Sequence, residues 1–134
     1  MKRCGKDCSA CPYIREVKSL NINTNEWKIN QNLNCEISNC IYLIECMKEH
    51  CNMKYVGETK RILKFRLAEH RGYVNNNVDT ATGEHFNLPG HTLSDLRITM
   101  LEKVRSNDDM YRKERERYFI RKFNTYYKGL NRQP

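Results

Sequence analysis

The chain of 134 residues has no long hydrophobic run, few prolines and glycines, and a single tryptophan. No segment approaches the roughly 18 apolar residues of a spanning helix, so we expect no contact with the membrane interior. Residues 1–20 lack the apolar core of a signal peptide, which favours an intracellular protein. The absence of internal repeats excludes a repeat architecture, and the length favours one domain.

Acidic residues are also scarce relative to basic ones, and the formal net charge is +8. This balance favours a polyanionic partner, either nucleic acid or an acidic membrane face, although a basic soluble protein without such a partner fits it equally well. Apolar and aromatic residues recur in patterned segments, which indicates a folded chain. In a protein expected to be intracellular, the seven cysteines indicate metal binding more than disulfides.

The hydrophobic pattern predicts a small α/β domain with a three-stranded, largely antiparallel sheet flanked by helices. Residues 41–46 form a short apolar run typical of a buried strand, and residues 54–58 form a second strand after a hairpin-like connection. Alternation at residues 96–100 predicts the third strand. Residues 1–38 look irregular, and residues 75–90 read as a loop.

Two helices are predicted. The first follows Thr59 as its N-cap and spans residues 60–74, and the second runs from residue 106 to about 124. The predicted buried face of the first consists of Ile62, Leu63, Arg66, Leu67, His70 and Val74. The predicted buried stripe of the second consists of Met110, Tyr111, Tyr118, Phe119 and Phe123.

Several motifs in order resemble the GIY-YIG nucleases. Residues 40–42 (Cys-Ile-Tyr) and 55–57 (Tyr-Val-Gly) resemble the two strands that name this family. The remaining residues that resemble the family's site are Arg66, His70, Glu116 and Asn131. Cys40 stands where the family name has glycine, and Phe119 stands where tryptophan is expected, but neither difference removes a group that the chemistry needs.

A narrower resemblance is to the endonuclease domain of Penelope-like retroelements, and it covers nearly the whole chain from residue 4 to 131. The motifs that carry it are Tyr-Leu-Ile-Glu-Cys at 42–46, Cys51, Tyr-Val-Gly-Glu-Thr at 55–59, His-Phe-Asn at 85–87, His91 and Gly-Leu-Asn at 129–131. The resemblance implies a DNA endonuclease that nicks target DNA to prime reverse transcription. It also implies a reverse transcriptase domain in the same polyprotein and a nuclear location.

The resemblance implies the following chemistry. Glu116 would hold a catalytic Mg²⁺ or Mn²⁺, since a carboxylate with water and phosphate oxygens suits such hard ions. Arg66 would pair with the scissile phosphate through its planar donors, and Asn131 would orient a hydroxyl or phosphate.

The general base implied by the resemblance is a tyrosine, either Tyr42 or Tyr55, with His70 accepting or relaying the proton. A phenol with a pKa of about 10 needs that pKa lowered to act at neutral pH. Taken singly, such tyrosines are usually core residues and such charges are usually solvated. A catalytic role for these residues is favoured only because all the motifs occur together and in this order.

Two zinc sites are expected. The resemblance implies an internal set of two cysteines and two histidines: Cys46, Cys51, His85 and His91. His50 remains a possible substitute for Cys51 or His91. The second candidate set comprises Cys4, Cys8, Cys11 and Cys35. The alternative is that these four cysteines are free thiols. We therefore expect a zinc-binding segment at 1–38 and a nuclease domain at 39–134, with Cys40 unpaired in the core.

The predicted second helix is basic, with eight basic against four acidic residues between 105 and 128. It either tracks DNA phosphates or is a solvated, salt-bridged helix. The predicted first helix adds basic residues at Lys60, Arg61, Lys64, Arg66 and Arg71. Two other functions fit the same residues: a non-catalytic zinc module that binds nucleic acid, and a repair nuclease acting on branched DNA.

Overall fold

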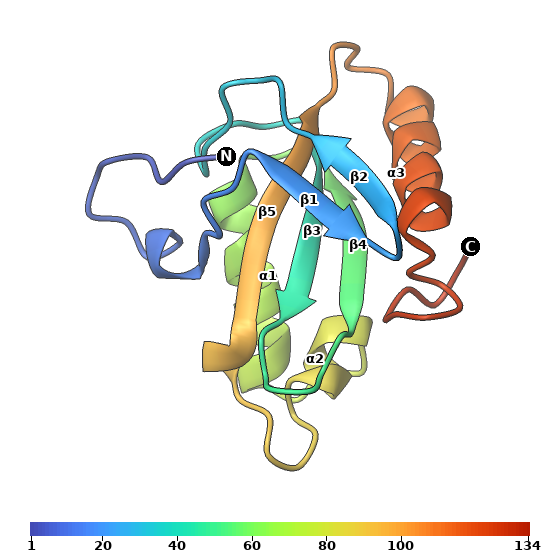
Figure 1. Cartoon of the computed structure of the whole chain (residues 1–134). Coiled ribbons are helices and arrows are strands. Elements are labelled where there is room, and N and C mark those ends of the chain that lie inside the picture. The colour runs from blue at the N-terminus through green and yellow to red at the C-terminus, as the bar shows by residue number, and fades with distance from the viewer.

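A three-stranded antiparallel sheet in the order β4–β3–β5 forms the centre of the computed structural model, which describes all 134 residues (Figure 1). The strands are β3 (Cys40–Cys46), β4 (Lys54–Thr59) and β5 (Leu96–Lys103). Helices pack against the sheet, so the predicted small α/β fold is confirmed. Strand β5 continues beyond the predicted residues 96–100 because Glu102 and Lys103 also pair with β3, past an irregularity in the register at Leu101.

Every residue of the central strand β3 is buried, because both faces of the sheet are covered. Helix α1 (Leu63–Asn75) covers one face, and helix α3 (Asp109–Phe123) lies on the other (Figure 1). A hairpin of β1 (Ser19–Ile22) and β2 (Asn25–Lys28) shares the second face. Burial on both sides explains why β3 reads as an almost continuous apolar run.

Helix α1 buries the side chains of Leu63, Leu67, His70 and Val74, as its periodicity predicts, but Ile62 and Arg66 of the predicted face are only partly buried. Its predicted start was wrong. Thr59 ends strand β4, and its hydroxyl accepts a hydrogen bond from the Arg61 amide at 3.1 Å instead of capping the helix. The first turn is capped by backbone carbonyls from residues 35 and 37, which sequence spacing does not reveal.

Helix α3 begins at Asp109, three residues after the predicted start at 106, and ends close to the predicted residue 124. The Asp108 carboxylate accepts from the Met110 amide at 2.9 Å, and Asn124 closes the helix at a φ of 54°. The predicted buried stripe was wrong in part, because Met110, Tyr111 and Tyr118 are exposed. The buried residues are Arg112, Phe119, Ile120 and Phe123.

Arg112 is buried because it has internal partners. Its guanidinium donates to Glu58 at 2.5 Å and to the Asn39 side chain at 3.0 Å. A buried cation is tolerated only when it is paired in this way, and a hydrophobic pattern does not detect it.

Two further predictions on connecting segments need correction. Residues 1–38 are not wholly irregular, since they contain the β1–β2 hairpin and a short 3₁₀ turn, η1 (Cys11–Tyr13). The predicted loop at 75–90 contains the short helix α2 (Ala81–His85), and a second 3₁₀ turn, η2 (Leu93–Asp95), precedes β5.

No helix in the chain has the length and hydrophobicity that crossing a membrane would require.

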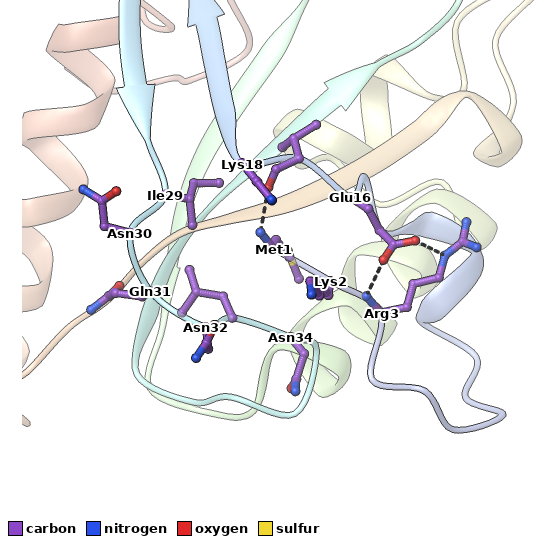
Figure 2. A pocket seen from close by; sticks show the side chains of 12 residues that line it. Met1, Lys2, Arg3, Glu16, Lys18, Ile29, Asn30, Gln31, Asn32 and Asn34 are labelled. Carbon is purple, nitrogen blue, oxygen red and sulfur yellow. Dashed lines mark hydrogen bonds and ion pairs between the residues drawn. The ribbon is translucent and has the colours of Figure 1, made fainter.

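A polar surface pocket lies beside the N-terminus, between residues 1–3, 16–18 and 29–34 (Figure 2). The α-amino group of Met1 donates to the Val17 carbonyl at 2.7 Å. None of its lining residues belongs to the predicted catalytic set.

Candidate active site

The hydroxyl of Tyr42 is the centre of a buried network. Tyr42 has no exposed surface, and its oxygen accepts a hydrogen bond from Arg66 Nε at 3.0 Å and lies 2.7 Å from His70 Nε2. Burial, followed by the neighbouring Tyr55, raises the pKa of Tyr42 well above its usual value. The structure thus brings Tyr42, Arg66 and His70 together, as the motif order predicts.

His70 is neutral in this network. Burial and the positive charge of Arg66 lower its pKa to about 3. Its Nδ1 lies 2.7 Å from the Thr82 hydroxyl. Because Arg66 donates to the Tyr42 oxygen, the hydroxyl hydrogen of Tyr42 is assigned to His70 Nε2. The proton of His70 then lies on Nδ1, directed toward Thr82. Neutral Nε2 therefore accepts a hydrogen bond from Tyr42 and orients its hydroxyl.

Gly57 provides the space that Tyr42 needs. The two residues are opposite each other in the β3–β4 ladder. A Cβ atom at position 57 would lie 2.4 Å from both the Cζ and the hydroxyl oxygen of Tyr42. The glycine of the Tyr-Val-Gly motif is thus a packing requirement of the Tyr42 ring.

Tyr55 connects this network to a surface pocket. Its ring centroid lies 6.5 Å from that of Tyr42 and 5.7 Å from that of His70. Tyr55 also lines a pocket shared with Glu58 and Glu116. Burial and then the charge of Glu116 raise the pKa of Tyr55.

Glu116 presents its carboxylate to that pocket from α3. Burial and the negative charge of Glu58 raise the pKa of Glu116 to about 7. A carboxylate that is half-buried beside another negative charge is a suitable oxygen ligand for a hard divalent cation. Glu58 is held in place by its hydrogen bond from Arg112.

Asn131 lies at the same pocket, but its amide is engaged elsewhere. Its Oδ1 accepts from the Val56 amide and its Nδ2 donates to the Val56 carbonyl, both at 2.8 Å. The side chain therefore pairs with β4 like an extra strand residue. This geometry differs from the expectation that Asn131 orients a phosphate.

The family model of the GIY-YIG catalytic domain matches residues 38–131, which is more than half of the chain. The chain belongs to the GIY-YIG family. The expected enzyme class, a GIY-YIG endonuclease, is confirmed by this membership. A search of curated proteins finds no match.

Among solved structures, the GIY-YIG domain is similar to the catalytic domain of the homing endonuclease I-TevI. The TM-score is 0.61 at 21% identity, and the alignment covers 72% of this chain and 100% of that one. At this identity the likeness shows a shared fold. The resemblance to Penelope-like retroelements stays a prediction.

Four residues near the site are not among those that the sequence patterns predict for it. Thr82, Glu58, Arg112 and Tyr73 surround the network or the pocket. Of these, only Glu58 could have been recognised from the sequence. It is an acidic residue of the Tyr-Val-Gly-Glu-Thr motif, near the end of the strand that carries Tyr55. Thr82 and Arg112 are brought in from distant segments, so no local pattern marks them.

The internal cysteine–histidine set of the GIY-YIG domain is assembled. The ligand atoms of Cys46, Cys51, His85 and His91 all lie within 4.8 Å of one another. His91 Nδ1 lies 3.2 Å from the Pro89 carbonyl, which leaves Nε2 free, and that buried nitrogen has no partner. A vacant ring nitrogen beside thiols is what a structural zinc requires.

His50 is not part of this cluster. Its imidazole is exposed and lies 3.4 Å from the Glu49 carboxylate. The four side chains that converge are therefore those that the resemblance implies, and His50 does not replace any of them.

The four N-terminal cysteines also converge. The sulfurs of Cys8 and Cys11 are 3.1 Å apart, and those of Cys4 and Cys35 each lie 3.6 Å from Cys8. Zinc–sulfur bonds of about 2.3 Å in a tetrahedron place sulfurs about 3.8 Å apart, so this cluster can also hold zinc. Cys40 lies outside both clusters and is buried in the core.

We expect Gly57→Ala to destabilise the GIY-YIG domain by about 2–3 kcal/mol, because the new methyl group overlaps the Tyr42 ring. Urea unfolding measures the change. The control is Gly72→Ala in α1, where no atom lies within 4 Å of the new methyl group and a small stabilisation is expected. Equal stability of Gly57→Ala and wild type would contradict the packing argument.

We expect metal analysis of the purified protein to find about two zinc ions per chain. His91→Ala and Cys8→Ala should each retain about one, because each removes a ligand from a different cluster. Cys40→Ala is the matched control and should retain both. Substantially less than one zinc in the wild type would rule out both sites.

Buried neutral His70 makes stability depend on pH. Its pKa is about 3 when folded and near 6.5 when unfolded, so only the unfolded chain gains this proton as pH falls below 6.5. Between pH 7 and 5 the wild type should lose about 1–2 kcal/mol more stability than His70→Gln. Urea unfolding at each pH tests this; parallel pH profiles for the two proteins would be inconsistent with a buried neutral histidine.

Proposed function

We propose that this GIY-YIG domain is a metal-dependent DNA endonuclease that nicks target DNA to prime reverse transcription during retroelement integration. The observation that carries the nuclease chemistry is the pocket shared by Tyr55 and Glu116. Behind it, Tyr42 is fixed between Arg66 and His70. A non-catalytic zinc module would not require these groups to converge.

Glu116 is the residue that would hold Mg²⁺ or Mn²⁺. Such a cation supplies polarisation of the phosphate and stabilisation of the leaving oxygen when it is bound. Arg66 uses Nε for Tyr42 and Nη1 for the Glu69 carboxylate at 3.4 Å, so Nη2 remains to pair with the scissile phosphate.

Tyr55 is the tyrosine that faces the attacking water, since it lines the pocket while Tyr42 is wholly enclosed. Both phenols have raised pKa values and are protonated at neutral pH. Tyr55 therefore orients water by hydrogen bonding, and its proton is lost more readily as pH rises. Tyr42 holds Arg66 and donates a hydrogen bond to neutral His70. Asn131 positions β4, the strand that carries Tyr55.

DNA contacts fall to basic side chains that the fold leaves exposed. Arg115 is paired with Glu102 at 2.7 Å, and Arg71 lies over the Tyr13 ring at 5.1 Å, so neither is available. Exposed basic residues on α3 are Lys113, Arg117 and Arg121. Lys113 and Arg117 border the Glu116 pocket, where a phosphate backbone would need them.

The retroelement role is supported by the motif string at 42–59 and by the ligand set of two cysteines and two histidines, both typical of Penelope-like endonucleases. It implies a reverse transcriptase domain in the same polyprotein and action in the nucleus. Priming demands a nick with a free 3′-hydroxyl. The nicked plasmid should therefore be extended by a DNA polymerase without prior end repair; a blocked 3′ end would refute the priming role.

We expect the wild-type domain to nick supercoiled plasmid in Mg²⁺ or Mn²⁺, and Glu116→Gln to lose at least about 100-fold in rate, because it removes the ligand charge. The matched control is Glu114→Gln, an exposed acid on the same helix, which should keep wild-type rates. Agarose gels measure conversion to the open circle. Absence of wild-type nicking, or equal rates for the two variants, would refute the nuclease proposal.

A preference for branched DNA would favour a repair nuclease instead. Cleavage of flap substrates against plain duplex of the same sequence distinguishes the two. We expect plain duplex to be nicked at a comparable rate.

A further inference from the structure

The N-terminal segment, residues 1–37, lies outside the part of the chain that matches the GIY-YIG family model. It nevertheless contacts both helices that carry the predicted catalytic groups. We infer that this segment is a brace that positions α1 and α3 on the sheet, and not an independent DNA-binding module. The inference rests on the proposed nuclease function for its kinetic consequence, but its structural consequence can be measured separately.

The tip of the β1–β2 hairpin caps the end of α3. Asn23 Nδ2 donates to the Phe123 carbonyl at 2.6 Å, and Asn25 Nδ2 donates to the Lys122 carbonyl at 2.8 Å. The last carbonyls of a helix have no partner within the helix, so these two amides satisfy groups that would otherwise face water. They fix the end of the helix that carries Glu116.

Trp27 of the same hairpin anchors α3 to the sheet. Its ring stands edge-on to Phe119 of α3 with centroids 4.8 Å apart. Its indole N–H donates to the Leu101 carbonyl of β5 at 2.9 Å. Together with buried Leu20 and Ile22, it forms part of the core between the hairpin, α3 and the sheet.

A second arm of the segment caps α1. The amides of Leu63 and Lys64 donate to the carbonyls of Ile37 and Cys35, at 3.0 and 2.9 Å. The N-cap residue of α1 makes no capping bond with its own side chain. These external carbonyls therefore set where α1 starts. Arg66 and His70, which hold Tyr42, follow later in the same helix.

The polar side chains of the segment point to the same conclusion. Arg15 makes two hydrogen bonds to the buried Glu45 carboxylate, at 2.8 and 3.0 Å. Tyr13 lies against the Arg71 guanidinium. Because Cys35 is also a member of the N-terminal cysteine cluster, a zinc ion there would tie the α1 cap to residues 4–11.

The test for the hairpin arm is the double variant Asn23→Gly/Asn25→Ala in the full chain. Glycine keeps the positive φ of 50° at position 23 and removes only the amide. Amide hydrogen exchange should quicken in α3 specifically, and the kcat for plasmid nicking should fall about 10- to 100-fold with little change in KM, because Glu116 is misplaced.

Asn21→Ala is the matched control: Asn21 lies in the same hairpin, is exposed and makes no hydrogen bond with its side chain to α3. It should match the wild type in exchange and kcat. Unchanged exchange in α3 of the double variant overturns the brace, whatever the activity. A raised KM with unchanged kcat also overturns it, since that is the signature of a DNA-binding module. A wild type that nicks no DNA would refute the nuclease function while leaving the exchange result to decide the brace.

The α1 arm is tested with Cys8→Ser/Cys11→Ser. The amides of Leu63 and Lys64 should exchange at least several-fold faster, while Cys40→Ala should leave them at wild-type rates. Equal protection of these two amides in both variants would overturn the second arm.

Discussion

Burial of the Tyr42 hydroxyl constrains the whole site. A phenol enclosed in the central strand needs hydrogen-bond partners inside the protein, and both that it finds, Arg66 and His70, come from one helix. Their spacing of one turn fixes the rotation of α1 against the sheet. The ring in turn requires Gly57 on the neighbouring strand. Core packing and the arrangement of reactive groups are therefore one and the same set of contacts.

The pocket beside strand β4 depends on this network through Tyr55. Tyr55 on β4 packs against the Tyr42 and His70 rings and also borders Glu116. The position of Glu116 depends on α3, which Arg112 links to Glu58 at the end of β4. Two cysteine-rich clusters and the hairpin support a domain of modest size.

Regular patterns were reliable guides to elements that bury a simple face. The apolar run of β3 and the 3.6-residue period of α1 correspond to the observed burial. The alternation of β5 marks a real strand, but Thr99, on the face expected to be polar, is buried as well. Patterns failed where polar groups are buried or caps come from elsewhere. Arg112 looks like a surface charge, and Thr59 looks like a helix cap, but ion pairs and distant carbonyls decide both positions.

The sequence by itself determined the order of reactive residue types, the number of candidate metal ligands and the family to which the chain belongs. Only the tertiary structure decided which tyrosine reaches the pocket, which arginines remain free for phosphate, and that the Asn131 amide pairs with β4. The physical reason is that solvent access and hydrogen-bond partners depend on residues far apart in the chain. Local spacing determines which side chains share a face, but packing determines what that face meets.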